Sequence, residues 1–524
     1  MRFGLKLNLP SIVIMLLCSI FNTGISQNKE VVRVEFPSKT MDQSYHTETL
    51  GEKGVLVFYE SNEITEEGER KWFFNLLNNN LTEQWLQYVA LKDGMVFEKT
   101  VHTPQQVFLL FTIRDNKKSL QSAFQILTYS IDKETFNLLG APMPPEADCR
   151  TFDVVGSHAF IGLTVQKKEA QLLAVDMRNA QLISLSPCSD GQCIIQETYH
   201  SRLSNELVIG FKKYTGNRFD ADLFVVYNMF GAETYRFEFR DEQQRYLHSY
   251  TFSDDAGGII SVVGSYDQAE KRKARLKDAN DELMNEAYGF FFLKFDPTGI
   301  KLARFVELST IDNIYSSMSS YDLIRSMQRQ SRKQNKDEKR SAVAFQFYNP
   351  QLVLKDNELV YAVEAFRPQF RTETRMDYDF YGRPIPYTYT VFDGFAFYGA
   401  LFAGFNSDGQ LTWNNNFEMR DLISFNLEKH LLVHDEQDGL LLAYILNGKI
   451  ISKMIQKDQD IGQVEQVKIE SDYETDRMLG EEHGNITHWY SDSFIISGVQ
   501  KIMNNRLRDN NERTVFYLNK FQLE

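Results

Sequence analysis

The chain has 524 residues, and its 57 basic and 71 acidic side chains give a formal net charge of −14. Hydrophobic residues make up 43% and charged residues 24%, which excludes a disordered chain and indicates a packed core. The acidic balance argues against a protein that binds nucleic acid over its whole surface. The length allows several ordinary domains or one large repeat architecture.

The first 26 residues have the order of a secretory signal peptide. Arg2 and Lys6 form a positive region, residues 12–21 form an apolar stretch, and Gly24 and Ser26 are the small residues of a cleavage site. The apolar stretch is too short for the roughly 20 residues that span a bilayer. We therefore predict cleavage after Ser26 and a mature chain that begins at residue 27.

Export follows from this leader. The alternatives are an uncleaved anchor or a lipoprotein signal at Cys18. No later stretch approaches the length of a membrane-spanning helix, so we expect no transmembrane span after signal cleavage. The expected location is the periplasm, the outer membrane or the extracellular space.

Short runs of β-branched and aromatic residues recur along the rest of the chain, separated by polar turns. Each run has a second strand-like run further on, and Asp-Gly or Asn-Gly pairs in the turns supply the positive φ angles of tight hairpins. The first five runs start 52, 52, 48 and 52 residues apart. The runs start at Val55, Val107, Ala159, Leu207, Ile259, Leu359, Leu431 and Phe494.

A unit of about 50 residues with three or four antiparallel strands has the size of a propeller blade. Eight units can be counted, or seven if residues 431–455 are only part of a blade. The last unit lacks a fourth strand, and the run at 31–36 before the first unit has no partner. This run could complete the last blade and close the ring, which would remove two sheet edges. We predict an all-β fold with one β-propeller over 27–524; the alternative is two β-sandwiches.

Three cysteines follow the leader, and export favours their oxidation. Cys188 and Cys193 could close a small loop, although Cys149 could pair with either of them. A zinc site would need a fourth ligand at matched spacing, and none is adjacent. We therefore expect a disulfide and no metal.

The periodicity resembles that of exported bacterial β-propellers of the broad WD40 and kelch-like architectural class, over nearly the whole mature chain. In addition, residues 406–413 (NSDGQLTW) resemble the Asp-box of sialidase-type propellers, with matches at Asp408, Thr412 and Trp413. The turn between the third and fourth strands is where an Asp-box belongs. The alternative is an ordinary Asp-Gly hairpin with a packed Trp.

Three long segments interrupt the repeat, at 265–289, 309–341 and 366–398. The first and third lie between the second and third strands of a unit, and the second joins two units. Because successive loops of an antiparallel blade alternate between its two ends, all three should emerge on one face. The first should be a charged helix, and the second a helix start followed by a basic stretch.

The third segment is rich in aromatic and basic residues. Tyr and Arg are residue types that anchor protein interfaces, and Arg also binds carboxylate or phosphate with two hydrogen bonds. The alternative is a decorated loop whose aromatic side chains pack on their own blade. The candidate binding residues are Phe366, Arg367, Phe370, Arg371, Arg375, Tyr378, Tyr381, Arg383 and Tyr387.

Catalytic and metal motifs are weak in this chain. The histidine pairs 430/434 and 483/488 have spacings that separate the two side chains on a strand. No nucleophile elbow, zincin helix, EF-hand loop or P-loop is present in the sequence. We expect a non-enzymatic binding or scaffold protein of the cell envelope, without a cofactor, whose partner is an envelope protein or a glycan and not a nucleic acid. The alternative is a glycan-active, sialidase-like hydrolase that uses the propeller funnel.

Overall fold

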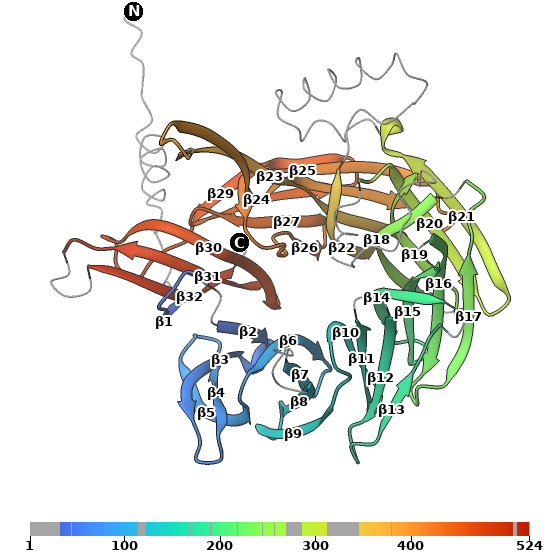
Figure 1. Ribbon diagram of the computed structural model, residues 1–524, viewed down its shortest axis with the longest axis horizontal. Coiled ribbons are helices and arrows are strands. Elements are labelled where there is room, and N and C mark those ends of the chain that lie inside the picture. The colour runs from blue at the N-terminus through green and yellow to red at the C-terminus, as the bar shows by residue number, and fades with distance from the viewer. Residues whose placement is uncertain are drawn as a thin grey trace, which may run out of the picture.

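The computed structural model describes residues 32–42, 45–113, 122–166, 169–188, 191–216, 218–243, 245–255, 257–268, 286–311, 345–378, 380–506 and 511–522. The elements in these ranges are 32 β-strands and two short 3-10 helices, η1 (Gly51–Lys53) and η2 (Leu308–Thr310). The strands form eight four-stranded sheets, which follow one another round a ring in chain order (Figure 1). The predicted all-β propeller with eight blades is confirmed.

We number the sheets as blades 1 to 8. Blade 1 contains β2 (Tyr45–Thr49), β3 (Val55–Ile64), β4 (Glu69–Leu77) and β5 (Glu83–Lys92), and blade 2 contains β6 (Met95–His102), β7 (Gln106–Ile113), β8 (Ala123–Ser130) and β9 (Thr135–Pro142). Blade 3 contains β10 (Ala147–Val155), β11 (His158–Val165), β12 (Glu169–Asp176) and β13 (Leu182–Leu185). Blade 4 contains β14 (Gln192–Ser201), β15 (Glu206–Thr215), β16 (Arg218–Asn228) and β17 (Glu233–Phe239).

Blades 5 to 7 follow the same order, and blade 8 takes its outermost strand from the N-terminal part of the chain. Blade 5 contains β18 (Arg245–Asp254), β19 (Ile260–Gln268), β20 (Gly289–Asp296) and β21 (Gly299–Glu307), and blade 6 contains β22 (Gln346–Lys355), β23 (Glu358–Tyr378), β24 (Pro384–Phe405) and β25 (Leu411–Ser424). Blade 7 contains β26 (Leu432–Glu436), β27 (Gly439–Leu446), β28 (Lys449–Gln456) and β29 (Gln459–Lys468). Blade 8 contains β30 (Arg477–Tyr490), β31 (Ser493–Met503), β32 (Glu512–Gln522) and β1 (Arg33–Pro37).

The apolar runs become the middle strands of the blades. In β7 (QVFLLFTI) the six residues between the two ends are buried, so both faces of the strand are covered. The outermost strand β29 has only exposed residues. The first strands are innermost, since β10 contacts β6 and β14, and β14 in turn contacts β18. Each middle strand therefore packs against two neighbouring blades.

Eight hydrophobic clusters of buried residues lie between consecutive blades, one at each junction of the ring. The junction between blades 8 and 1 combines Tyr45 and Val55 with Phe516 and Leu518. Trp489 of β30 also donates its indole N–H to the carbonyl of Gly54, at 3.0 Å. The ring is therefore closed by the same kind of apolar packing that joins the other blades.

The first strand of the chain completes the last blade. β1 pairs antiparallel with β32, from Arg33 opposite Asn519 to Pro37 opposite Val515. This pairing fills the fourth position of blade 8, as the complementary ends of the sequence predicted.

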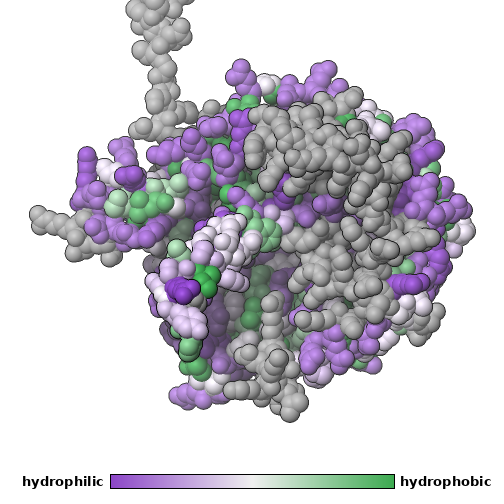
Figure 2. Space-filling model, turned by 45° about the horizontal axis from the view of Figure 1, so that its top comes forward, coloured by the Kyte–Doolittle hydropathy of each residue, from purple (hydrophilic) through white to green (hydrophobic). Residues whose placement is uncertain are grey.

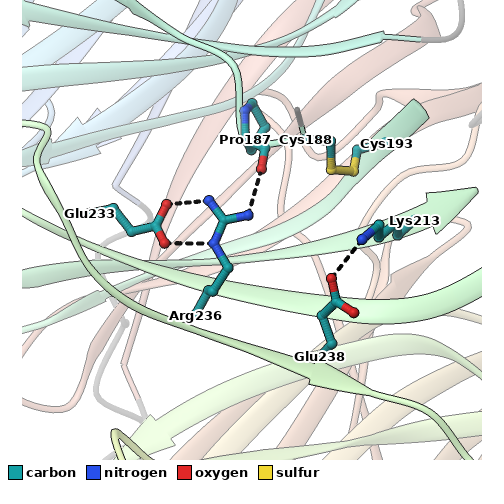
Figure 3. Close-up of a disulfide and its surroundings, with 7 residues drawn as sticks. All are labelled: Pro187, Cys188, Cys193, Lys213, Glu233, Arg236 and Glu238. Carbon is teal, nitrogen blue, oxygen red and sulfur yellow. Dashed lines mark hydrogen bonds and ion pairs between the residues drawn. A yellow bond between two sulfur atoms is a disulfide. The ribbon is translucent and has the colours of Figure 1, made fainter. Parts of the chain in front are cut away.

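Cys188, in the connection from blade 3 to blade 4, forms a disulfide with Cys193 at the start of β14 (Figure 3). Arg236 of β17 donates to the carbonyl oxygen of Pro187, at 3.2 Å, and pairs with Glu233. Cys193 is buried in the cluster between the two blades, and Cys149 lies outside the disulfide. The bridge thus fastens the connection beside an interblade core.

Several predictions concern residues outside those that the structure describes. They are the leader at 1–26 with Cys18, the charged helix within 265–289, and the helix start and basic stretch within 309–341. In the described ranges, no helix has the length and apolar character needed to span a bilayer.

The roots of the three long segments lie next to one another. Ala287, near the end of the first segment, bridges to Phe345, which follows the second. The next residue, Gln346, pairs with Phe366 at the start of the third. All three segments therefore leave the ring from adjoining points at the junction of blades 5 and 6.

Candidate binding surface

The segment at 366–398 is an extension of two strands and not a loop. β23 and β24 pair continuously from Leu359 opposite Phe405 to Tyr378 opposite Pro384. β25 stops pairing with β24 at Phe395, so the two strands run on beyond it as a two-stranded ribbon (Figure 1). We call residues 369–394 the arm. Two-stranded ribbons gain little stability on their own, which makes a large exposed arm notable.

The two faces of the arm differ in charge. Because side chains alternate along a strand, even-numbered residues of β23 share one face and odd-numbered residues the other. The uncharged face holds Phe370, Thr372, Thr374, Met376 and Tyr378, with Phe392, Thr390, Thr388, Pro386 and Pro384 opposite them. The charged face holds Arg371, Glu373, Arg375 and Asp377, with Val391, Tyr389, Tyr387 and Ile385 opposite them.

Large apolar side chains of the arm are exposed to solvent. Phe370 is 58% exposed, Tyr378 is 70% exposed and Phe380 is 96% exposed. Met376 and Tyr387 are also exposed. On the side of the molecule drawn in Figure 2, hydrophilic surface surrounds separate, small apolar patches. Against such a surface, a protruding set of aromatic side chains has the composition of an interaction site.

Most of the predicted binding residues lie on the arm, but Phe366 does not. Its side chain is 1% exposed and packs among Phe397 and other buried residues between blades 6 and 7. The prediction that Phe366 binds a partner is therefore wrong, because β22 and blade 7 cover this part of β23. Arg367 lies at the base of the arm, where its Nε donates to the hydroxyl of Tyr398 at 2.8 Å.

Charged side chains on the arm pair with one another. Arg371 lies 3.0 Å from a carboxylate oxygen of Glu373 and 3.2 Å from one of Asp393. Tyr389 donates its hydroxyl proton to Glu373 at 2.9 Å, which raises the pKa of the Tyr389 phenol. The tip carries Tyr381 and Arg383, whose guanidinium lies 5.8 Å from the centre of the Tyr381 ring. These exposed contacts order the ribbon without burying it.

The innermost strands of six blades carry β-bulges. The register shifts in β6, β10, β14, β18, β22 and β30. The bulges of β6 and β10 fall near the starts of these strands, the ends at which the blade-to-blade connections arrive. Bulges redirect side chains and are common next to binding sites. Sequence periodicity could not reveal them, because one extra residue in a short strand leaves its apolar pattern readable.

Buried polar side chains on the second strands accompany the bulges. Glu98 in the bulge of β6 accepts a hydrogen bond from Thr112 at 2.6 Å. Asn349 in the bulge of β22 donates to Glu364 at 2.7 Å. Burial raises the pKa of the Glu364 carboxyl to about 7, and backbone N–H groups of His430 and Leu431 oppose the rise.

A second carboxyl with a raised pKa lies on an innermost strand. Burial raises the pKa of Glu197 in β14 to about 7, with a smaller contribution from the neighbouring charge of Asp153. Lys99 of β6 acts in the opposite direction. The pKa of Asp153 in β10 is also raised, again by burial. Three blades thus bring two acids and a lysine close enough to interact.

The histidines do not form a metal site in the part of the chain that the structure describes, where no group of three metal-ligating side chains occurs. His430 is buried against Phe397, with ring centres 4.6 Å apart, whereas His434 stacks on His488 at 4.3 Å. His483 contacts Glu428 at 2.7 Å, and this hydrogen bond raises the histidine pKa.

The turn at Asn406 is a tight Asx turn. The Asn406 side chain accepts hydrogen bonds from the backbone N–H groups of Asp408 and Gln410, and Gly409 has a φ of +68°. The same bonds recur at Asn78 in blade 1 and at Asn228 in blade 4. Trp413 packs beside the turn and donates to Glu358 at 2.9 Å. The turn geometry therefore repeats where the sequence motif does not.

No protein-family model matches the chain, and no curated protein does either. One similar solved structure is dihydro-heme d1 dehydrogenase NirN in complex with DHE, with a TM-score of 0.44 and 10% identity over 94% of this chain and 79% of that one. Another is the polysaccharide lyase Uly1, with a TM-score of 0.39 and 9% identity over 81% of this chain and 89% of that one. A third is the beta-propeller domain of the trilobed protease from Pyrococcus furiosus. Its TM-score is 0.32, with 10% identity over 84% of this chain and 99% of that one.

Proposed function

We propose that this chain is an exported, non-enzymatic binding protein of the cell envelope, and that its partner docks on the arm. The observation that carries the proposal is the exposure of aromatic side chains on a ribbon that leaves the ring. Phe380, Tyr378 and Phe370 each expose more than half of their surface. Exposed aromatic side chains cost solubility, so their concentration on one protrusion favours a surface that is covered in use.

The composition of the arm fits a protein partner. Tyr and Arg supply most of the strong anchors in protein interfaces, and both types occur on the charged face, at Arg371, Arg375 and Tyr387. The bulged strand β22 pairs with β23 at the base of the arm, so a partner on the arm would lie close to this irregular strand. A glycan could also stack on these aromatic side chains and is the alternative partner.

Export is supported by two features that do not depend on the arm. The N-terminal residues have the order of a leader, and Cys188 and Cys193 are joined. Disulfides persist in oxidising compartments such as the periplasm. Expression with the native leader, followed by fractionation and N-terminal sequencing, tests this part; a cytoplasmic product that retains Met1 would contradict it.

Removal of the arm tests the binding proposal. In the variant, Asn-Gly replaces residues 371–391, so that Phe370 and Phe392 flank a two-residue hairpin turn. Crosslinking in the native envelope followed by mass spectrometry should identify a partner with the intact protein and lose it with the variant. The matched control replaces the exposed Ile461 and Val464 of β29 by Thr. Retained capture by the variant, at an unchanged melting temperature, would contradict the proposal, and retention on a glycan array would favour the glycan.

The alternative of a glycan-active hydrolase has one supporting observation. A hydrolase needs a carboxylic acid that stays protonated near neutral pH, and Glu197 has a pKa of about 7 with Asp153 nearby. A screen with aryl-glycosides tests it. Turnover by the native chain that disappears in Glu197→Gln, with the fold unchanged, would replace the binding proposal.

A further inference from the structure

The arm has one strand edge that is suited to pairing. β22 leaves β23 after Phe366, and among the described residues no other strand pairs with that edge of β23. The opposite edge belongs to β24, where Pro384 and Pro386 lack the N–H groups that a new strand would need. Residues 369–378 of β23 contain no proline. An added strand would therefore join β23 and not β24.

The charge pattern along this edge of β23 is complementary to the same pattern in a second, antiparallel copy of the chain. From Arg371 to Asp377 the charged face alternates positive, negative, positive and negative. In an antiparallel pair of two copies centred on Thr374, Arg371 faces Asp377 of the second copy and Glu373 faces Arg375 of the second copy. All four ionic contacts then join opposite charges, which stabilise cross-strand pairs.

The uncharged face matches in the same register. Phe370 then faces Tyr378 of the second copy, Thr372 faces Met376, and Thr374 faces its own equivalent. Aromatic pairs and Thr–Thr pairs are favourable across strands. The exposed surfaces of Phe370 and Tyr378 would be partly covered by this arrangement.

Neighbouring registers are disfavoured by the same charges. A shift of two residues in one direction places Arg371 opposite Arg375 of the second copy and Glu373 opposite its own equivalent. A shift in the other direction places Glu373 opposite Asp377 and Arg375 opposite its own equivalent. Like charges directly opposite each other destabilise a strand pair, so the pattern selects one register.

From this we propose that two copies of the chain associate through the edge of β23 in the arm, antiparallel about Thr374, and form a four-stranded sheet between them. The contact is two-fold symmetric, so the same patch serves both copies and the assembly closes as a dimer. The inference goes beyond the proposed function, since it concerns an edge of the arm and needs no other partner. Both faces of the joined sheet remain available to a bound protein.

Charge reversal tests the register. Analytical ultracentrifugation of the purified chain over about 1 to 100 µM should show a reversible dimer. Glu373→Arg and Arg375→Glu each place like charges opposite one another at both symmetric positions, so each should raise the dimer dissociation constant at least about tenfold. The double variant E373R/R375E should recover dimerisation. The matched control, Glu465→Arg on the exposed β29, should leave the dimer unchanged.

Mixing the two single variants separates a lost interface from a lost fold. In the mixture the new arginine of the E373R chain would meet the new glutamate of the R375E chain. The unchanged Arg375 of the first chain would likewise meet the unchanged Glu373 of the second, so a heterodimer should form from two monomeric samples. A native chain that stays monomeric over this range, single variants that dimerise like the native chain, or a mixture that stays monomeric would each overturn the proposal. Partner capture in the envelope is measured separately, so failure here leaves the proposed function to its own test.

Discussion

Arg33 donates through Nη2 to the side-chain oxygen of Gln500 at 3.0 Å, across the seam where the start of the chain meets its end. The same guanidinium donates to Asn519 at 2.9 Å and lies 4.6 Å from the ring centre of Tyr517. Its side chain is 1% exposed. A single buried cation thus holds the first strand to the two strands that precede the C-terminus.

Replacing Arg33 by Met should open this seam. The change leaves the side-chain oxygens of Gln500 and Asn519 without their buried donor, although Glu35 keeps its contact with Arg513, so we expect a loss of about 3 kcal/mol in the free energy of unfolding. Urea denaturation followed by tryptophan fluorescence measures it. The matched control is Arg420→Met, since Arg420 forms a solvent-exposed pair with Glu418 and its loss should have a much smaller effect. Equal effects of the two changes would show that Arg33 does not hold the seam.

Two phenylalanines four residues apart should respond differently to truncation. Phe366→Ala leaves a cavity between blades 6 and 7 and should cost about 3 to 5 kcal/mol. Phe370→Ala on the exposed arm should change stability by no more than about 0.5 kcal/mol. Thermal denaturation of both variants gives the comparison. A large loss for Phe370→Ala would mean that the arm is packed in solution.

Loss of the disulfide should weaken the connection between blades 3 and 4. The double variant C188S/C193S removes a short covalent loop, and the expected loss is about 2 kcal/mol. The oxidised native chain should become less stable by a similar amount when a reductant is added, whereas the variant should not respond. The matched control, Cys149→Ser, should keep the response to reductant. A native chain that is indifferent to reductant would contradict a role for the bridge.

Stability should fall as the pH rises from about 5 to 8. The pKa of Glu364 is raised to about 7, so the folded state favours its neutral form. The stabilising contribution of neutral Glu364 is fully present below the pKa of glutamate in the unfolded chain. It is lost as the pH rises through the pKa of Glu364 in the folded protein. Glu364→Gln cannot ionise, so over this interval it should lose less stability than the native chain, by on the order of 1 to 3 kcal/mol. Denaturation midpoints at several pH values test this, and parallel curves for the two proteins would exclude the effect.

Much of the fold could be predicted because patterns of neighbouring residues indicate its strands and turns. Apolar runs such as that at Val107 are buried on both faces, so they appear as continuous hydrophobic segments. The pairing of Arg33 through Pro37 with β32 followed from counting strands at the two ends. The Asx turns at Asn78 and Asn228 were missed, since the residue with positive φ differs between them, Leu81 in one and Gly231 in the other.

The candidate site was predicted only in part. The segment at 366–398 could be recognised by its length and its Tyr and Arg content, but its pairing as a ribbon could not. Phe366 and Phe370 have the same side chain, and only the cover provided by blade 7 and β22 separates a core residue from an exposed one. The interaction of Glu197 with Asp153 and Lys99 likewise joins three blades that are distant in sequence.

By itself, the sequence determined that this protein is a repeat of antiparallel hairpins with an aromatic, basic interruption, because alternation, apolar runs and turn residues act over a few neighbouring positions. Only the tertiary structure decided which of those residues face solvent, which strand edge is left unpaired among the described strands, and which acids are buried together. Those properties depend on contacts between blades, and the free energy of such contacts comes from residues that local patterns do not connect.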